Sequence, residues 1–191
     1  RPVRETENLS PTTYEELLFE DAYYVEKARA EHDEFAKVLR DNGTEVVYLE
    51  NLVAEVISIN EELKQQFLEQ FVYEAKIDKK SKLFPTVMKY LNTYKDNKEL
   101  VDKLIAGTRY NELKNDGEKS LSELSPSDLF VLKPMPNTIF TRDPFSTIGN
   151  GFSLHTMKFE TRIRETIFGY YIFKYHPEYK GTTKYYNRGR S

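Results

Sequence analysis

The sequence PMPNTIFTRDPFSTIGNG, residues 134–151, decides how the rest of the chain is interpreted. Its prolines, Pro134, Pro136 and Pro144, restrict the backbone on both sides of an apolar middle, because proline fixes its own φ and biases the preceding residue toward extended conformations. Residues 138–141 are predicted to form a short buried strand, since β-branched and aromatic side chains favour strands. Asp143 would then lie at the carboxyl end of that strand.

Asp143 has two interpretations at such a position. A carboxylate just past a buried strand can receive a planar cation such as guanidinium through two parallel hydrogen bonds. Alternatively, Arg-Asp-Pro forms a surface turn in which the aspartate bonds to its own backbone and the proline ends the strand. On residue types alone the turn is favoured, because paired carboxylates are often structural.

The residues that follow predict a hairpin and a helix. Two β-prone runs, residues 145–148 and 152–155, flank Gly149-Asn150-Gly151, and Asn-Gly between such runs is the strongest short hairpin signal. A helix is predicted over about residues 159–175, with Arg162 on an early turn and an end imposed by Pro177. Residues 180–191 lack apolar periodicity and are expected to be irregular.

The first part of the chain predicts a helix, a turn and a strand. Apolar side chains recur at helical spacing from Val25 to Leu39, and Asn42-Gly43 supplies a left-handed end. Residues 45–49 are predicted to form a strand, which gives a helix-turn-strand unit of an α/β layer. His32 lies near the apolar edge of the helix and is interpreted as a packing or capping residue, not a catalytic one.

Residues 51–124 differ in character, because the strand pattern gives way to charged segments with apolar residues at i, i+3 and i+4. We expect four or five amphipathic helices there, with lysine- and glutamate-rich faces in solvent. Residues 125–128 close this segment, and residues 129–132 return to β structure.

Composition excludes several classes of protein. The 191 residues are 39% hydrophobic, which is enough for one core. The 28 basic and 31 acidic side chains are interspersed, with a net charge of −3, and this argues against nucleic-acid binding. No apolar run approaches the ~20 residues of a membrane span. With no cysteine, and with His32, His155 and His176 scattered, we expect no cofactor, no metal and a cytoplasmic location.

Residues 134–151 resemble the signature of the arginine deiminase family. Other segments follow the same family order, namely residues 5–11, 15–21, 31–35, 41–46 and 160–166, the last reading ETRIRET. The resemblance extends to about residue 179 and implies an α/β fold, a partial pentein propeller with an inserted all-helical domain. It divides the chain into an incomplete first propeller module at 1–50, the helical insertion at 51–124, a second module at 125–179 and the tail at 180–191.

The family hydrolyses L-arginine to L-citrulline and ammonia: a cysteine thiolate attacks the guanidinium carbon, carboxylates hold the cation and a histidine moves protons. The resemblance implies that Asp143 grips the guanidinium and that Phe140 lines the same slot. It also implies that Asn137 contacts the amino-acid end and that Arg162 meets the α-carboxylate. The alternative for Arg162 is an ion pair with a neighbouring glutamate on a helix surface, which is worth less than ~1 kcal/mol.

The sequence lacks the family's nucleophilic cysteine, and its histidine motif and second guanidinium-binding aspartate are expected further along. The chain, which begins at Arg1 and not at methionine, is therefore expected to be a truncated arginine deiminase that is inactive alone. Two alternatives stay open: a non-catalytic module that binds arginine or a protein, and one half of a split enzyme. The expected partners are L-arginine, a complementary C-terminal half or a second copy, with no nucleic acid and no membrane.

Overall fold

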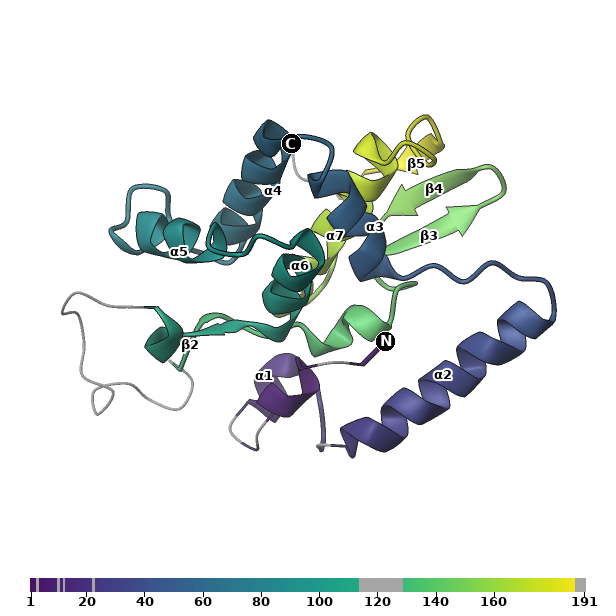
Figure 1. The fold of residues 1–191 in the computed structure, drawn as a ribbon, viewed down its shortest axis with the longest axis horizontal. Coiled ribbons are helices and arrows are strands. Elements are labelled where there is room, and N and C mark those ends of the chain that lie inside the picture. Colours follow the sequence, from purple (N-terminus) through teal and green to yellow (C-terminus); the bar gives the residue numbers. More distant parts are fainter. Residues whose placement is uncertain (3, 10, 12, 22, 114–128, 188–191) are drawn as a thin grey trace. The chain divides into compact units, whose positions relative to one another are not determined.

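The computed structural model describes residues 1–191 except residues 3, 10, 12, 22, 114–128 and 188–191. The described residues form helices and small sheets, which confirms a mixed α/β fold (Figure 1). They divide into two compact units. The first comprises Arg1–Tyr48 and Asp102–Ile139, and the second comprises Leu49–Val101 and Phe140–Ser191. The division into propeller modules stays a prediction.

The first unit contains several short elements and one long helix. In chain order they are η1 (Thr6–Asn8), α1 (Tyr14–Leu17), α2 (Val25–Asp41), β1 (Thr108–Arg109), η2 (Tyr110–Glu112), β2 (Phe130–Leu132) and η5 (Pro136–Ile139). Strands β1 and β2 pair antiparallel, with Thr108 opposite Leu132. The backbone of Met135 donates a hydrogen bond of 2.9 Å to the carbonyl of Ile105, which ties the chain after β2 to the end of α6 (Asn97–Ala106). The return to β structure near residue 130 is confirmed.

Helix α2 and its predicted end are confirmed. Gly43 has a φ of +81°, the left-handed conformation that closes a helix. Its N–H donates to the carbonyl of Arg40, and Thr44 N–H donates to Leu39. The predicted strand at residues 45–49 is wrong: residues 44–48 have no regular structure and helix α3 (Leu49–Ile57) starts at Leu49. No strand in the described part of the chain pairs with residues 45–48, whereas Val53, Val56 and Ile57 form a buried helical face.

The strand predicted at residues 138–141 is also wrong. Residues Pro136–Ile139 form the 3-10 helix η5, and residues 141–144 form a turn. Proline fits the first helical position because it has no N–H to leave unsatisfied. The Thr138 hydroxyl then donates a hydrogen bond of 2.8 Å back to the carbonyl of Met135, which favours the local turn over an extended chain. Asp143 therefore lies within a turn that precedes a strand, and not at the end of a strand.

The amphipathic helices predicted after residue 50 are present in the described residues. They are α3, α4 (Glu61–Glu74), α5 (Leu83–Leu91) and α6. Asn60 caps α4, since its side-chain oxygen accepts from Leu63 N–H at 2.8 Å. The predicted apolar positions are largely buried, including Leu63, Phe67, Leu68, Phe71, Val72, Val87, Leu91, Leu100, Val101, Leu104 and Ile105. Residues 114–124, and the segment 125–128 expected to close the insertion, lie outside the described residues.

The second unit contains a three-stranded sheet of β3 (Phe145–Ile148), β4 (Gly151–Leu154) and β5 (Thr183–Tyr186), in that order. The predicted hairpin is confirmed, with Phe145 opposite Leu154 and Ile148 opposite Gly151. Gly149 opens the two-residue loop with a φ of +55°, as a type II′ turn requires.

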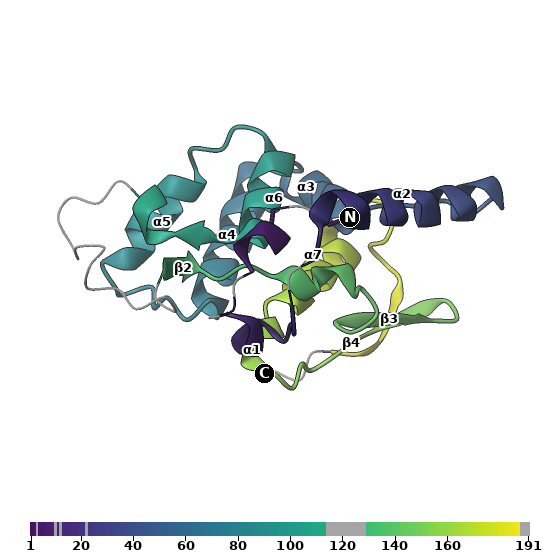
Figure 2. The ribbon, with the colours of Figure 1, turned by 90° about the horizontal axis from the view of Figure 1, so that it is seen from below.

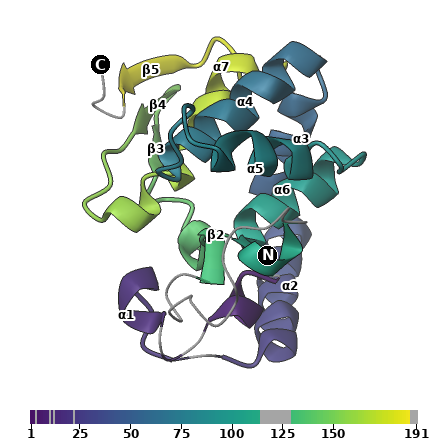
Figure 3. The same cartoon turned by 90° about the vertical axis from the view of Figure 1, so that its left-hand side faces the viewer.

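The irregular tail predicted at residues 180–191 is wrong for Thr183–Tyr186, which form β5 parallel to β4 (Figure 3). Threonine and tyrosine favour strands, and the open edge of β4 supplies the partner.

Helix α7 (Glu165–Tyr175) packs between α4 and the hairpin, and Figure 2 shows it next to β3 and β4. On one side, the ring of Phe67 lies 6.2 Å from that of Phe168 and 5.0 Å from that of Tyr171. On the other side, Phe173 stacks on Phe152 with 4.0 Å between ring centroids. The helix predicted over residues 159–175 is confirmed from Glu165, and the 3-10 turn η6 (Glu160–Arg162) stands in place of its first turn. No helix among the described residues combines the length and the apolar character needed to cross a membrane.

We expect Phe168→Ala to lower the free energy of unfolding by about 3–5 kcal/mol, because Phe168 is fully buried in the aromatic cluster. Urea unfolding followed by circular dichroism measures this loss. The matched control is Phe35→Ala, since Phe35 is 64% exposed, and we expect it to change the unfolding free energy by less than about 0.5 kcal/mol. Equal losses in the two variants would contradict the packing described here.

We expect Gly151→Ala to detach β5 from β4. A Cβ at position 151 would lie 2.5 Å from the backbone oxygen of Thr183 and 2.4 Å from the ring of Tyr185, too close for either to remain in place. Hydrogen exchange should show lost protection in β5 and retained protection in β3 and β4. Asn150→Ala, in the exposed loop one residue earlier, should leave β5 protected.

Candidate functional site

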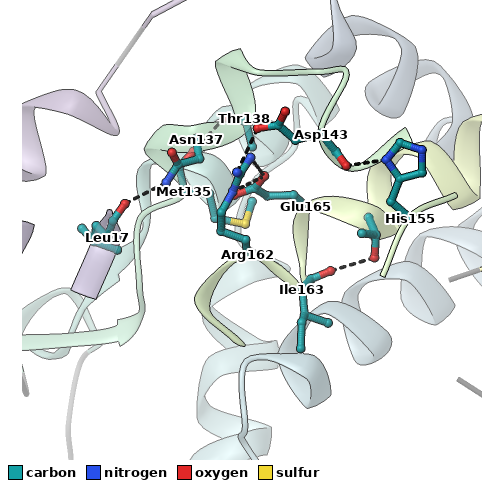
Figure 4. Close-up of polar contacts among 10 residues, drawn as sticks. Leu17, Met135, Asn137, Thr138, Asp143, His155, Arg162, Ile163 and Glu165 are labelled. Atoms are coloured by element: carbon teal, nitrogen blue, oxygen red, sulfur yellow. Dashed lines mark hydrogen bonds and ion pairs between the residues drawn. The ribbon is translucent and has the colours of Figure 1, made fainter. Parts of the chain in front are cut away.

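Asp143 lies on a turn that backbone contacts hold at both ends. Its N–H donates to the carbonyl of Phe140 at 3.1 Å. His155 follows β4 and reaches back: its N–H donates to the carbonyl of Pro144 at 2.9 Å, and its Nδ1 lies 2.7 Å from the carbonyl oxygen of Asp143 (Figure 4). A carbonyl only accepts, so the contact requires the proton on Nδ1. The turn thus presents the Asp143 carboxylate, which is 47% exposed, from a fixed backbone.

The guanidinium of Arg162 is shared by two carboxylates. Its Nε and Nη2 donate to Glu165, the closest contact being 2.8 Å from Nη2 to Oε2, while Nη1 donates to Oδ2 of Asp143 at 2.9 Å (Figure 4). The turn η6 carries Arg162, and Glu165 opens α7 three residues later. The Arg162 and Glu165 side chains are only 12% and 2% exposed. The guanidinium therefore has one buried acceptor and one exposed acceptor.

Burial and ion pairing shift the pKa values of Glu165 and Arg162 in opposite directions. Burial raises the pKa of the Glu165 carboxyl, and the hydrogen bonds from Arg162 lower it by less, so that the pKa stays above its ordinary value. Burial lowers the pKa of the Arg162 guanidinium, but the hydrogen bonds to Glu165 and Asp143 outweigh it and leave the pKa raised. Both oxygens of Glu165 accept from Arg162, as an ionised carboxylate does, and the N-terminus of α7 favours that negative charge. The guanidinium of Arg162 therefore stays positively charged and is held in place by Glu165.

The neighbouring Arg164 is buried on a different side. Its guanidinium carbon lies 5.2 Å from the centre of the Phe71 ring, and burial lowers its pKa to about 10, opposed by the charges of Glu165 and Glu74. Arg164 therefore packs against the aromatic cluster, whereas Arg162 faces the exposed Asp143.

The four predicted site residues fall in both units. Phe140, Asp143 and Arg162 belong to the second unit, where Asp143 and Arg162 meet and the side chain of Phe140 is exposed. Asn137 belongs to the first unit, where it is buried and its Nδ2 donates to the carbonyl of Leu17 at 2.7 Å (Figure 4). Their roles toward a ligand stay predictions.

Sequence reasoning missed Glu165 and His155. The ion pair weighed as the alternative for Arg162 is present, and its partner is Glu165. The spacing of three residues was the available signal, because side chains at i and i+3 lie on one face of a helix. The contact of His155 with Asp143 follows from the register of the hairpin, which brings residue 155 beside residue 144. Within the described ranges, no three histidine or acidic side chains gather closely enough to hold a metal ion.

Comparison with known proteins identifies the family. The family model described as arginine deiminase matches residues 15–191. The chain is 48% identical over 182 residues to an arginine deiminase of Clostridium perfringens, covering 95% of this chain and 44% of that relative. It is 49% identical over 193 residues to an arginine deiminase of Streptococcus pneumoniae, covering 98% of this chain and 46% of the relative.

The chain spans less than half the length of these relatives. The match nevertheless runs through every helix and strand from α2 to β5, and through the turn of Asp143 and the Arg162–Glu165 pair. On this extent of similarity, the chain belongs to the arginine deiminase family.

Proposed function

We propose that this chain forms part of an L-arginine-binding site in which the Asp143 carboxylate receives the guanidinium group. The observation that carries the proposal is the contact of Asp143 with a guanidinium, that of Arg162, at 2.9 Å. The carboxylate is exposed and lies on a turn held by His155, so a second guanidinium can approach it from solvent. The similarity to arginine deiminases supports L-arginine as the ligand.

The other site residues take complementary roles in this proposal. Arg162 meets the α-carboxylate of the ligand, since a guanidinium and a carboxylate pair through matched, charge-assisted hydrogen bonds. Phe140, whose ring is exposed next to the turn, lines the slot for the guanidinium. Asn137 contacts the amino-acid end. The two charged ends of arginine are thus matched by charges of opposite sign.

In the complete protein we propose that the bound arginine is hydrolysed to citrulline and ammonia. A thiolate adds to the guanidinium carbon, ammonia leaves, and water releases citrulline from the thiol. The 191 residues contain no cysteine, so the thiol must come from another polypeptide segment. By itself this chain binds arginine without converting it. The proposal includes a partial pentein propeller as the fold and a cytoplasmic location.

We expect the chain to bind L-arginine and Asp143→Asn to weaken that binding. Loss of a hydrogen bond between charged groups removes about 1.5–3 kcal/mol, which raises Kd by roughly ten- to hundredfold. Calorimetric titration of both proteins with L-arginine measures the change.

The matched control is Asp33→Asn, because Asp33 is 46% exposed and also accepts from an arginine, Arg1, at 2.6 Å. We expect this control to bind arginine as the unchanged chain does. Equal binding by the Asp143 variant and by the unchanged chain would remove Asp143 from the site.

We expect citrulline only when a thiol-bearing segment is added. The chain alone, incubated with L-arginine, should give none. Mixed with the part of the Clostridium perfringens relative that it does not cover, it should give citrulline, and Asp143→Asn should abolish the gain. Citrulline from the chain alone would refute the assignment of a cysteine nucleophile. Arginine binding without citrulline in the mixture would favour a module that binds arginine and does not catalyse.

A further inference from the structure

We propose that Asn150 is a site of spontaneous covalent modification, at which the side-chain amide is lost through a cyclic imide and aspartate or isoaspartate is left in the hairpin loop. The sequence contains two Asn-Gly pairs, Asn42-Gly43 and Asn150-Gly151. Glycine permits this reaction because it has no Cβ to obstruct the ring that its backbone nitrogen closes on the preceding side chain. The inference does not depend on the proposed function.

The reaction needs only the two residues and water. The backbone nitrogen of Gly151 attacks Cγ of Asn150, so that the N–Cγ bond forms and the Cγ–Nδ2 bond breaks. Ammonia leaves with the proton that the Gly151 nitrogen loses. Water then opens the imide. Addition of water at Cγ gives aspartate, and addition at the backbone carbonyl carbon gives isoaspartate, in which the main chain runs through Cβ and Cγ.

The surroundings of Asn150 leave its side chain free to reach the attacking nitrogen. Asn150 is exposed in the two-residue loop between β3 and β4, after Gly149 with its φ of +55°. No residue in the described part of the chain forms a hydrogen bond with the Asn150 side chain. Gly151 belongs to the last pair of the hairpin before the loop, opposite Ile148. Pairs at the end of an element open most readily, which releases the Gly151 nitrogen for attack.

The other Asn-Gly pair is held in an unreactive arrangement at the end of α2. Nδ2 of Asn42 donates a hydrogen bond of 2.8 Å to the carbonyl of Val38. The nitrogen of Gly43, which would have to attack, donates to the carbonyl of Arg40 at 2.9 Å. Both bonds must break before the ring can close. The two asparagines are exposed and both precede glycine, so only their hydrogen bonds distinguish them.

Isoaspartate at position 150 would disturb the point at which the three strands meet. Gly151 lies opposite Ile148 in β3 and opposite Thr183 in β5. Even a Cβ on Gly151 would lie 2.5 Å from the backbone oxygen of Thr183, so there is no room for Gly151 to move toward β5. Isoaspartate adds one atom to the main chain just before Gly151 and displaces it. Older molecules therefore carry an extra negative charge in the loop and a loosened β5.

The test incubates the unchanged chain at physiological temperature and mildly alkaline pH and follows both asparagines by peptide mass spectrometry. We expect amide loss at Asn150 to be about tenfold or more faster than at Asn42, because two hydrogen bonds must first break at Asn42. Labelling by an isoaspartate methyltransferase should identify the product. In urea the two rates should become similar, because the difference comes from the folded structure. Equal rates in the folded chain, or a difference that persists in urea, would overturn the proposal.

Two variants separate the parts of the proposal. Asn150→Gln keeps an exposed amide but would require a larger ring, so we expect no amide loss at this position and full hydrogen-exchange protection of β5 after the same incubation. Freshly prepared Asn150→Asp carries the added charge without the longer main chain and should also keep β5 protected. The incubated unchanged chain should lose that protection. Retained protection of β5 in molecules that carry isoaspartate, or an equal loss in Asn150→Gln, would overturn the link between the modification and β5.

Discussion

The burial of α7 on two sides is the constraint on which the second unit depends. The helix supplies Phe168 and Tyr171 to the aromatic cluster of α4 and Phe173 to the hairpin, so α4 and the sheet are joined through it. Such ring contacts add about 0.5–1.5 kcal/mol each beyond the burial of their area. Since Glu165 is the first residue of α7, the packing of the helix also fixes the acceptor that orients Arg162.

The candidate site shows how one cation can serve two purposes when its acceptors differ in exposure. Glu165 is buried and opens a helix, and its pairing with Arg162 is therefore part of the structure. Asp143 is exposed on a turn, and its pairing with the same arginine is weak and open to competition. Both acceptors are carboxylates at similar distances, but they differ in solvent access, and Glu165 accepts from both Nε and Nη2 of the guanidinium.

Patterns within short stretches of sequence correctly predicted the elements that are stabilised by contacts within the same stretch. Helix α2 with Gly43, the helices after residue 50 and the hairpin around Gly149 all followed from spacing and turn residues. The strands predicted at residues 45–49 and 138–141 did not form, because a strand needs a neighbour that the sequence does not reveal, and Pro136 and Thr138 support a 3-10 turn instead. Strand β5 was missed for the same reason, since its partner β4 lies about thirty residues earlier.

The candidate site was only partly predictable for a related reason. Asp143 and Arg162 were recognisable as charged residues of a signature, but nothing in their sequence separation indicates that they form a hydrogen bond. That contact depends on η6 and the turn before β3, whose relative placement is set by α7 and the hairpin. The family resemblance therefore predicted which residues bind the ligand, whereas the distance between Asp143 and Arg162 is determined by the packing of the elements that carry them.

The parallel pairing of β4 with β5 has a consequence for the order in which the chain folds during synthesis. The hairpin of β3 and β4 is local and can form within microseconds of leaving the ribosome. Residues 183–186 emerge only after all of α7, a delay of more than a second at ordinary translation rates. Throughout that interval the outer edge of β4 offers unpaired N–H and C=O groups to any neighbouring chain. Strand β5 therefore ends a period of aggregation risk.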